Sequence, residues 1–184
     1  MKVLNLYAGI GGNRELWGDD IEVTAVEIDE EIAGIYKANF PKDKVIVGDA
    51  HQYLLDHYKE FDFIWSSPPC STHSRMRNAL KKKVYPNMQL YEEIIFLSKW
   101  FKGYYVVENV IPYYKPLIKP SVVLARHSIW ANFNIPIKEF KSIVVSKSTK
   151  EQLAVFHGIN VSKRLHLRNC VNPQLAKYIM GCLL

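Results

Sequence analysis

Short apolar runs alternate with longer segments of helical periodicity along much of this chain, and this alternation limits the fold more than any other feature. The runs are apolar enough to be buried on both faces, as strands of parallel sheets are. The order predicts an α/β fold with a doubly wound, mostly parallel sheet. Strands are predicted at Val3–Ala8, Glu22–Glu27, Val45–Val47, Phe61–Ser66 and Tyr104–Val107, and helices at Asn13–Trp17, Asp29–Phe40, Gln52–Tyr58 and Asn87–Lys102.

The pattern is looser after Val110. A strand-like stretch covers His127–Phe133, and a helix is predicted at Thr149–His157, with Thr149 as N-cap and Gly158 as the C-terminal signal. The last segment, Pro173–Leu184, has apolar residues at helical spacing and is expected to cover the sheet.

Composition favours one soluble domain. The 184 residues are 48% hydrophobic, which is enough for a single packed core spanning 1–184. The cysteines are widely separated, without the spacing of a zinc site or a disulfide framework, so no metal and a reducing compartment are expected. The first apolar run is too short for a signal or membrane span, so the expected location is the cytoplasm, without a membrane partner. A net charge of +6 favours a polyanionic partner.

Cys70 follows directly on a predicted buried strand. Two prolines, Pro68 and Pro69, stiffen the chain before it, so the thiol is held at a defined position where a nucleophile would be useful.

The ends of the first three predicted strands together describe a pocket for a nucleoside. A glycine loop follows the first strand, Glu27 ends the second, where it can accept hydrogen bonds from ribose hydroxyls, and Asp49 follows the third, where it can bind an exocyclic amine. The loop lacks the Lys-Ser/Thr ending of a triphosphate site, so an adenosine without a long phosphate tail is predicted. The loop residues are Tyr7, Ala8, Gly9, Ile10, Gly11 and Gly12.

A basic run follows Cys70 and contains no acid before Tyr91. An isolated run of this kind is often a solvated loop, but beside a nucleophile it favours a loop that closes on nucleic-acid phosphates. The candidate contacts are Ser71, Arg75, Arg77, Lys81, Lys82 and Lys83.

The glycine loop, the Pro-Cys pair and the Glu108-Asn109-Val110 segment together resemble the DNA cytosine-5 methyltransferase family. The resemblance implies a Rossmann-like methyltransferase fold in which the loop binds S-adenosylmethionine, released as S-adenosylhomocysteine. It implies that Cys70 is the nucleophile, that Glu108 holds the cytosine and that Arg126 belongs to an arginine-bearing motif that orients the intermediate. DNA is the implied partner.

Further cofactor contacts follow from the same resemblance. Glu27 and Asp49 match the family's ribose and adenine contacts, Ile28 matches its apolar residue beside the adenine, and Pro68, two residues before the nucleophile, is a further expected contact. A segment near the chain end is similar to the family's closing motif, which returns to the cofactor: Asn169, Cys170 and Val171.

Four departures from the family stand out, and one is that the motif around Arg126 holds one arginine where many members have two. Tyr7 replaces the usual phenylalanine, and Arg168 stands where glycine is usual. A short insert, 131–166, replaces a full target-recognition domain, so sequence choice could depend on a second protein.

The expected reaction is methylation of cytosine C5 in DNA through a covalent cysteine adduct at C6 of a flipped base, as in restriction–modification. An RNA cytosine-5 methyltransferase and a non-catalytic or partner-dependent nucleic-acid-binding subunit remain alternatives. An amino-methyltransferase is a weaker one, because its motif shares both prolines but not Ser67 or Cys70. The histidines lack ligand spacing, although His73 and His127 lie near the predicted site.

Overall fold

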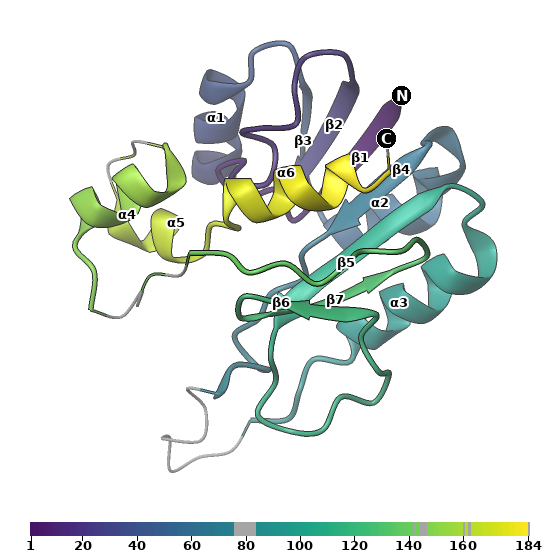
Figure 1. The fold of residues 1–184 in the computed structure, drawn as a ribbon. Helices are drawn as coiled ribbons and strands as arrows, with labels where there is room; N and C mark the ends of the chain where they lie inside the picture. The colour runs from purple at the N-terminus through teal and green to yellow at the C-terminus, as the bar shows by residue number, and fades with distance from the viewer. Residues whose placement is uncertain (76–83, 142, 144–146, 160, 162, 184) are drawn as a thin grey trace.

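The computed structural model describes residues 1–75, 84–141, 143, 147–159, 161 and 163–183. These residues form one sheet with helices on both faces (Figure 1). The strands are β1 (Lys2–Leu6), β2 (Glu22–Glu27), β3 (Lys44–Val47), β4 (Phe63–Ser66), β5 (Tyr104–Val110), β6 (Val122–Leu124) and β7 (His127–Ala131). The helices are α1 (Glu30–Asn39), α2 (Ala50–His57), α3 (Gln89–Trp100), α4 (Lys150–His157), α5 (Arg164–Arg168) and α6 (Pro173–Gly181), with a 3-10 turn at Tyr58–Glu60.

The strand order is β3-β2-β1-β4-β5-β7-β6. The first five strands in this order are parallel, while β7 is antiparallel to both of its neighbours. The predicted doubly wound, mostly parallel α/β sheet is therefore confirmed. The chain order reverses between β1 and β4, and the carboxyl ends of two such strands are where open α/β sheets bind ligands.

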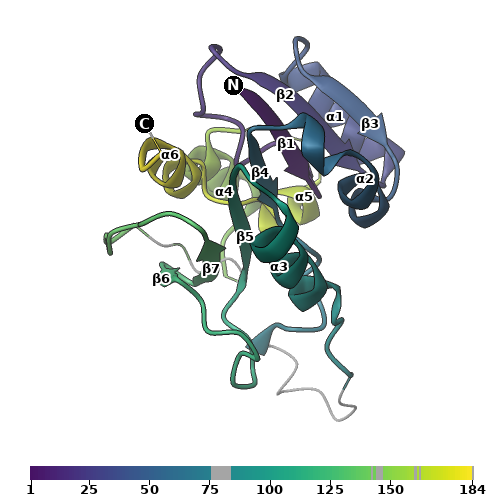
Figure 2. The same cartoon turned by 90° about the vertical axis from the view of Figure 1, so that its right-hand side faces the viewer.

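Two apolar layers hold the helices on the sheet. On one face of the sheet, Phe63 and Trp65 pack in a cluster with Ile179 of α6, and the opposite face packs Leu4 and Ile64 against α2 and α3. Figures 1 and 2 show α6 on one side of the sheet and α3 on the other. The expectation that the last segment covers the sheet is thus confirmed.

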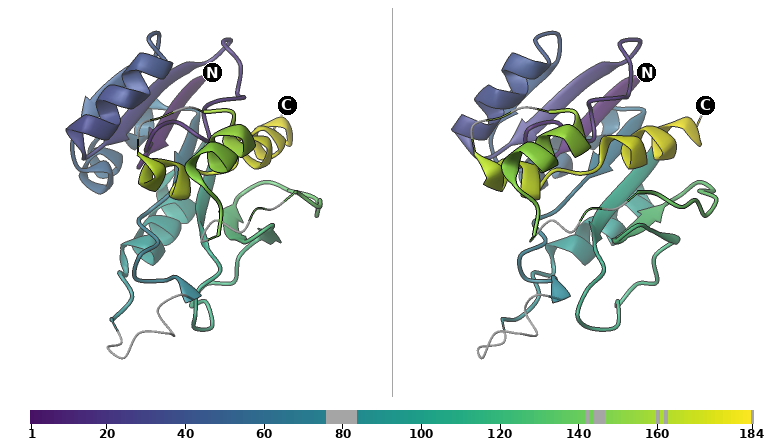
Figure 3. Two further views of the ribbon diagram at one scale, coloured as in Figure 1. Left: turned by 90° about the vertical axis from the view of Figure 1, so that its left-hand side faces the viewer. Right: turned by 60° about the vertical axis from the view of Figure 1, so that its left-hand side comes forward.

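The helices α4 and α5 lie beside α1 and α6, as Figure 3 shows. They pack against the glycine loop in one apolar cluster that contains Ile10, Leu153 and Leu167. Thr149 caps α4 with a capping box, and Gly158 ends it with φ +72°, both as predicted. No helix among the residues placed in the structure has the length and apolar character needed to cross a bilayer.

The helix predicted at Asn13–Trp17 was wrong. Residues 11–17 form turns, and Asn13 and Arg14 are buried there because Asn5 and Asp43 satisfy their polar groups. The strand β6 and the short helix α5 were not predicted.

Candidate active site

Cys70 follows the short irregular segment after β4 and stands at the start of a turn. The backbone amides of His73 and Ser74 both donate to the Cys70 carbonyl at 3.0 Å, which folds the chain back immediately after the thiol. Burial raises the pKa of the Cys70 thiol, and the negative charge of Glu108 raises it further. The thiol is therefore well positioned, but its surroundings favour the protonated form over the nucleophilic thiolate.

Glu108 lies on β5, and its two carboxyl oxygens have different partners. Ser67 Oγ donates to Oε2 at 3.0 Å, and Oε1 pairs with Nδ1 of His127 on β7. The Trp65 indole donates to Ser67 Oγ at 2.9 Å. Because an indole can only donate, the single Ser67 hydroxyl proton is left to point at Glu108. The carboxyl group is therefore held in one orientation.

Asn109 joins the Glu108 strand to the Cys70 turn. Its Nδ2 donates to the Pro68 carbonyl at 2.8 Å, and the side chain is buried. A further bridge pairs Ser74 with Pro112, beyond the end of β5. The structure thus brings the predicted nucleophile and the predicted cytosine-holding carboxyl group to the same edge of the sheet.

The glycine loop is folded onto the end of β2. The Gly9 amide donates to Glu27 Oε2 at 2.9 Å, and the Asp29 amide donates to Oε1 at 3.1 Å. A Cβ added to Gly9 would meet no atom within 4 Å, so the backbone there borders open space. Ala8 and Ile10 bury their side chains in the core, which leaves the loop backbone as the surface for a ligand.

The closing motif lies against the same loop. A Cβ on Gly12 would be 2.0 Å from Cys170 Sγ and 2.6 Å from the Val171 carbonyl oxygen, so only glycine fits this position. Asn169 is exposed and forms the C-cap of α5. Burial raises the pKa of Cys170 to about 12, which suits a packing residue. The first and last predicted cofactor motifs are therefore neighbours in space.

Asp49 and Ile28 are the remaining predicted cofactor contacts at the strand ends. Asp49 accepts a hydrogen bond from the Gln52 amide at 3.0 Å and so caps α2. Ile28 is 70% exposed and presents an apolar side chain beside Glu27. Both placements are compatible with an adenosine pocket, and the contacts proposed for them stay predictions.

Glu93 is a buried carboxyl group that sequence reasoning missed. It lies on α3 without exposed surface and accepts hydrogen bonds from the Tyr7 hydroxyl and the Ser66 hydroxyl, each at 2.5 Å. His51 Nδ1 lies 3.1 Å from the same carboxyl group. Glu93 therefore links the ends of β1 and β4 to the start of α2. The sequence contains one sign of this role, because Glu93 is an acid within the apolar stripe of the helix predicted at Asn87–Lys102.

Arg126 lies in the turn between β6 and β7, where its side chain is exposed. Ala125 before it has φ +51°, and the Arg126 carbonyl accepts a hydrogen bond from the Ile111 amide at 3.2 Å. The adjacent His127 is the residue that reaches Glu108. A catalytic role for Arg126 stays a prediction.

Part of the predicted nucleic-acid contact can be placed. Ser71 and Arg75 are exposed on the turn after Cys70. Arg77, Lys81, Lys82 and Lys83 lie outside the described residues.

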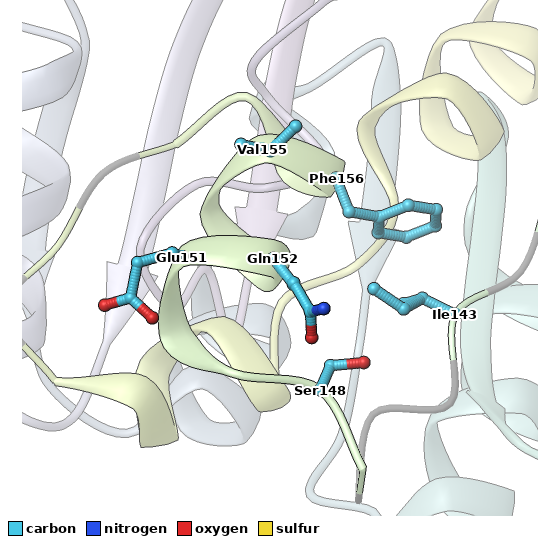
Figure 4. Close-up of a pocket in the computed structure, with 6 residues that line it drawn as sticks. All are labelled: Ile143, Ser148, Glu151, Gln152, Val155 and Phe156. Carbon is cyan, nitrogen blue, oxygen red and sulfur yellow. The ribbon is translucent and has the colours of Figure 1, made fainter.

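A separate open pocket of about 530 Å³ lies on α4 (Figure 4). The figure shows the Phe156 ring and the Ile143 side chain facing one another across it. Its lining is Ile143, Ser148, Glu151, Gln152, Val155 and Phe156, none of which is a predicted site residue.

Two curated relatives are tRNA (cytosine(38)-C(5))-methyltransferases. The relative from Spodoptera frugiperda is 38% identical over 80 residues, which are 40% of this chain and 24% of the relative. The relative from Homo sapiens is 28% identical over 82 residues, which are 41% of this chain and 21% of the relative. The chain thus aligns with about a quarter or less of each relative's length.

Among solved structures, a mutant of Spodoptera frugiperda DNMT2 is similar over 78% of this chain and 54% of that chain, with 22% identity and a TM-score of 0.47. An S-adenosylmethionine-dependent methyltransferase from Agrobacterium tumefaciens is similar over 60% of this chain and 38% of that chain, with 18% identity and a TM-score of 0.45.

The family model for C-5 cytosine-specific DNA methylases matches residues 1–112. This match covers more than half of the chain and includes the glycine loop, Cys70 and Glu108. The chain therefore belongs to the C-5 cytosine-specific DNA methylase family.

Proposed function

We propose that this chain transfers a methyl group from S-adenosylmethionine to C5 of cytosine in DNA. The observation that carries the proposal is the set of hydrogen bonds that joins the Cys70 turn to the Glu108 strand, through Ser67 and Asn109. A thiol and a fixed carboxyl group at one sheet edge can act together on one base, the first as nucleophile and the second as a hydrogen-bonding partner.

The residues around the glycine loop fit the cofactor. The open space at Gly9 gives room for a nucleoside, Glu27 offers a carboxyl group and Ile28 offers an exposed apolar surface. Tyr7–Gly12 would hold the methionine part, with Asp49 and the closing motif at its border. S-adenosylmethionine would supply the methyl group.

The chain's own residues supply the rest of the chemistry. Cys70 Sγ, as thiolate, forms a bond to C6 of the flipped cytosine, and the electron pair of the C5–C6 double bond makes C5 nucleophilic. With the base bound, Glu108 in its protonated form donates a hydrogen bond to N3 and accepts one from the exocyclic amine, which polarises the ring. After C5 takes the methyl group, a base removes the C5 proton, the double bond forms again and Sγ leaves as thiolate.

A second candidate is the same reaction on RNA. Its support is that both curated relatives carry the name of tRNA methyltransferases. In either case we propose one catalytic domain in which 131–166 takes the place of a full target-recognition domain, with a second protein as a source of target choice.

Transfer of a labelled methyl group to matched DNA and RNA duplexes and single strands tests the proposal. We expect label in cytosine C5 of DNA with the wild-type chain and none with Cys70→Ala. Label in RNA alone would favour the second candidate. Methyl transfer that persists in Cys70→Ala would contradict both, and transfer only after a second protein is added would support a partner-dependent subunit.

A further inference from the structure

We propose that His127 is a positioning residue that pairs with Glu108 and offsets its charge, and in this way sets the readiness of Cys70 to become a thiolate. This inference rests on the proposed function for the role of Cys70 as nucleophile. The contacts that carry it are independent of the substrate.

The register of β5 and β7 places the two side chains on one face. Val110 pairs with His127 and Glu108 pairs with Ile129, so His127 is the diagonal neighbour of Glu108. The side chain of His127 is 22% exposed and that of Glu108 is 6% exposed. The imidazole therefore lies against a buried carboxyl group and still reaches solvent, from which it can take a proton.

The contact requires a proton between the two groups. His127 Nδ1 and Glu108 Oε1 can form a hydrogen bond only if one of them carries a hydrogen, because two lone pairs would repel. At the other oxygen, the Ser67 hydroxyl already donates its proton. Without a bound base, each oxygen of an ionised Glu108 thus accepts one hydrogen bond. An imidazolium at His127 makes the His127–Glu108 pair neutral overall.

This proton matters for Cys70 because the negative charge of Glu108 raises the pKa of its thiol. An imidazolium at His127 offsets that charge and makes the thiolate easier to form, whereas a neutral side chain does not. Among the described residues, Cys70 on the turn after β4 is a titratable group that interacts with the charge of Glu108, and the exposed Arg126 precedes His127 along the chain. His73, on the same turn as Cys70, instead pairs with the Tyr114 hydroxyl at 2.6 Å.

The alkylation rate of Cys70, measured against pH by mass spectrometry of its peptide, tests this directly. His127→Asn keeps a donor near Oε1 but cannot become positively charged. We expect Cys70 in this variant to react roughly threefold or more slowly at and below neutral pH. Glu108→Gln should speed the reaction, and adding His127→Asn to Glu108→Gln should change nothing further. If His127→Asn does not fold, His127→Gln serves as the second uncharged donor.

A surface pair provides the matched control. His57 Nδ1 lies 2.7 Å from Glu60 on the exposed end of α2, so His57→Asn should leave the alkylation of Cys70 unchanged. An alkylation profile of His127→Asn equal to that of the wild type would overturn the inference. Equal slowing by His127→Asn with and without the Glu108 carboxylate would overturn it too, because the effect would then not depend on the pairing with Glu108.

The rate of methyl transfer is a second measurement, and it distinguishes a failure of this inference from a failure of the proposed function. The ratio of wild-type to His127→Asn rates should be larger at low pH than at high pH, because only the wild-type side chain can carry a positive charge. A constant ratio contradicts the inference. If the wild-type chain methylates no nucleic acid, the proposed function fails, while the alkylation profile still decides the role of His127.

Discussion

The Asn109 side chain donates a hydrogen bond to the Pro68 carbonyl at 2.8 Å, so the strand that carries Glu108 also holds the turn that carries Cys70. The bond crosses from β5 to the segment after β4, two neighbouring parallel strands. This hydrogen bond therefore fixes the segment that carries the nucleophile relative to the strand that carries the carboxyl group.

Asn109→Ala should therefore impair catalysis more than binding. Loss of the bond frees the Pro68 carbonyl, and displacement of a reacting group by about 1 Å can cost about 100-fold in rate. We expect kcat for methyl transfer to fall by about that factor with KM little changed, and stability to fall by about 1–3 kcal/mol.

Asn132→Ala is the control for this variant. Asn132 bridges the other end of β5, donating to the Gly103 carbonyl at 2.9 Å and accepting from the Tyr105 amide at 3.0 Å. It should lower the free energy of unfolding without a selective effect on kcat. Equal kcat losses in the two variants would show that Asn109 acts only through stability.

Tyr7→Phe tests the buried Glu93. The change removes one of the two hydroxyl donors to a carboxyl group that has no exposed surface, and an underpaired buried acceptor costs about 1–3 kcal/mol. Urea unfolding should show that loss, and the exposed Tyr85→Phe should change stability by less than about 0.5 kcal/mol. Equal midpoints for wild type and Tyr7→Phe would mean that Glu93 does not need this donor.

Gly12→Ala should push apart the glycine loop and the closing motif, which together border the predicted cofactor site. Its Cβ would collide with Cys170 Sγ and with the backbone of Val171, so the loop and the closing motif must move apart. We expect weaker binding of S-adenosylhomocysteine by calorimetry and a lower melting temperature. Gly34→Ala, on α1 with open space around its Cβ, should instead stabilise the chain by about 0.5–1 kcal/mol and leave binding unchanged. Unaltered binding of S-adenosylhomocysteine by Gly12→Ala would show that the contact between the loop and the closing motif does not matter for the cofactor.

Stability should fall as pH falls from about 6.5 to about 4, and His157 should be a main cause. Burial lowers the pKa of His157 to about 4, whereas an unfolded histidine has a pKa of about 6.5. Between these values the unfolded chain binds a proton that the native chain does not, so unfolding becomes easier by at most about 1.4 kcal/mol per pH unit.

Urea midpoints measured from pH 7 to pH 4.5 check this. His157→Leu should reduce the slope without abolishing it, because burial also lowers the pKa of His73. The same slope in wild type and His157→Leu would show that other groups control the acid sensitivity.

The central strands were predictable because each is a short apolar run between segments of helical period. The turns at 11–17 were not, because Arg14 is buried only by virtue of Asp43, which the fold brings to it. Local spacing carries no information on such a partner.

The same limit separates the predicted from the missed site residues. Cys70 follows a strand and Glu108 lies on one, and each belongs to a recognisable motif. Their residue types and their neighbours along the chain are therefore enough to indicate their chemistry. His127 and Glu93 gain their importance from partners across the sheet, Glu108 and Tyr7, and no spacing along the chain reveals those contacts.

The most direct measurement is covalent trapping with nucleic acid that contains 5-fluorocytosine. Fluorine at C5 blocks the proton removal that frees the thiol, so the bond between Cys70 and C6 should persist. With S-adenosylmethionine present, we predict an adduct that survives denaturation, maps to the Cys70 peptide and is absent in Cys70→Ala. Methyl transfer to unmodified substrate without any such adduct on the fluorinated one would contradict a Cys70 nucleophile.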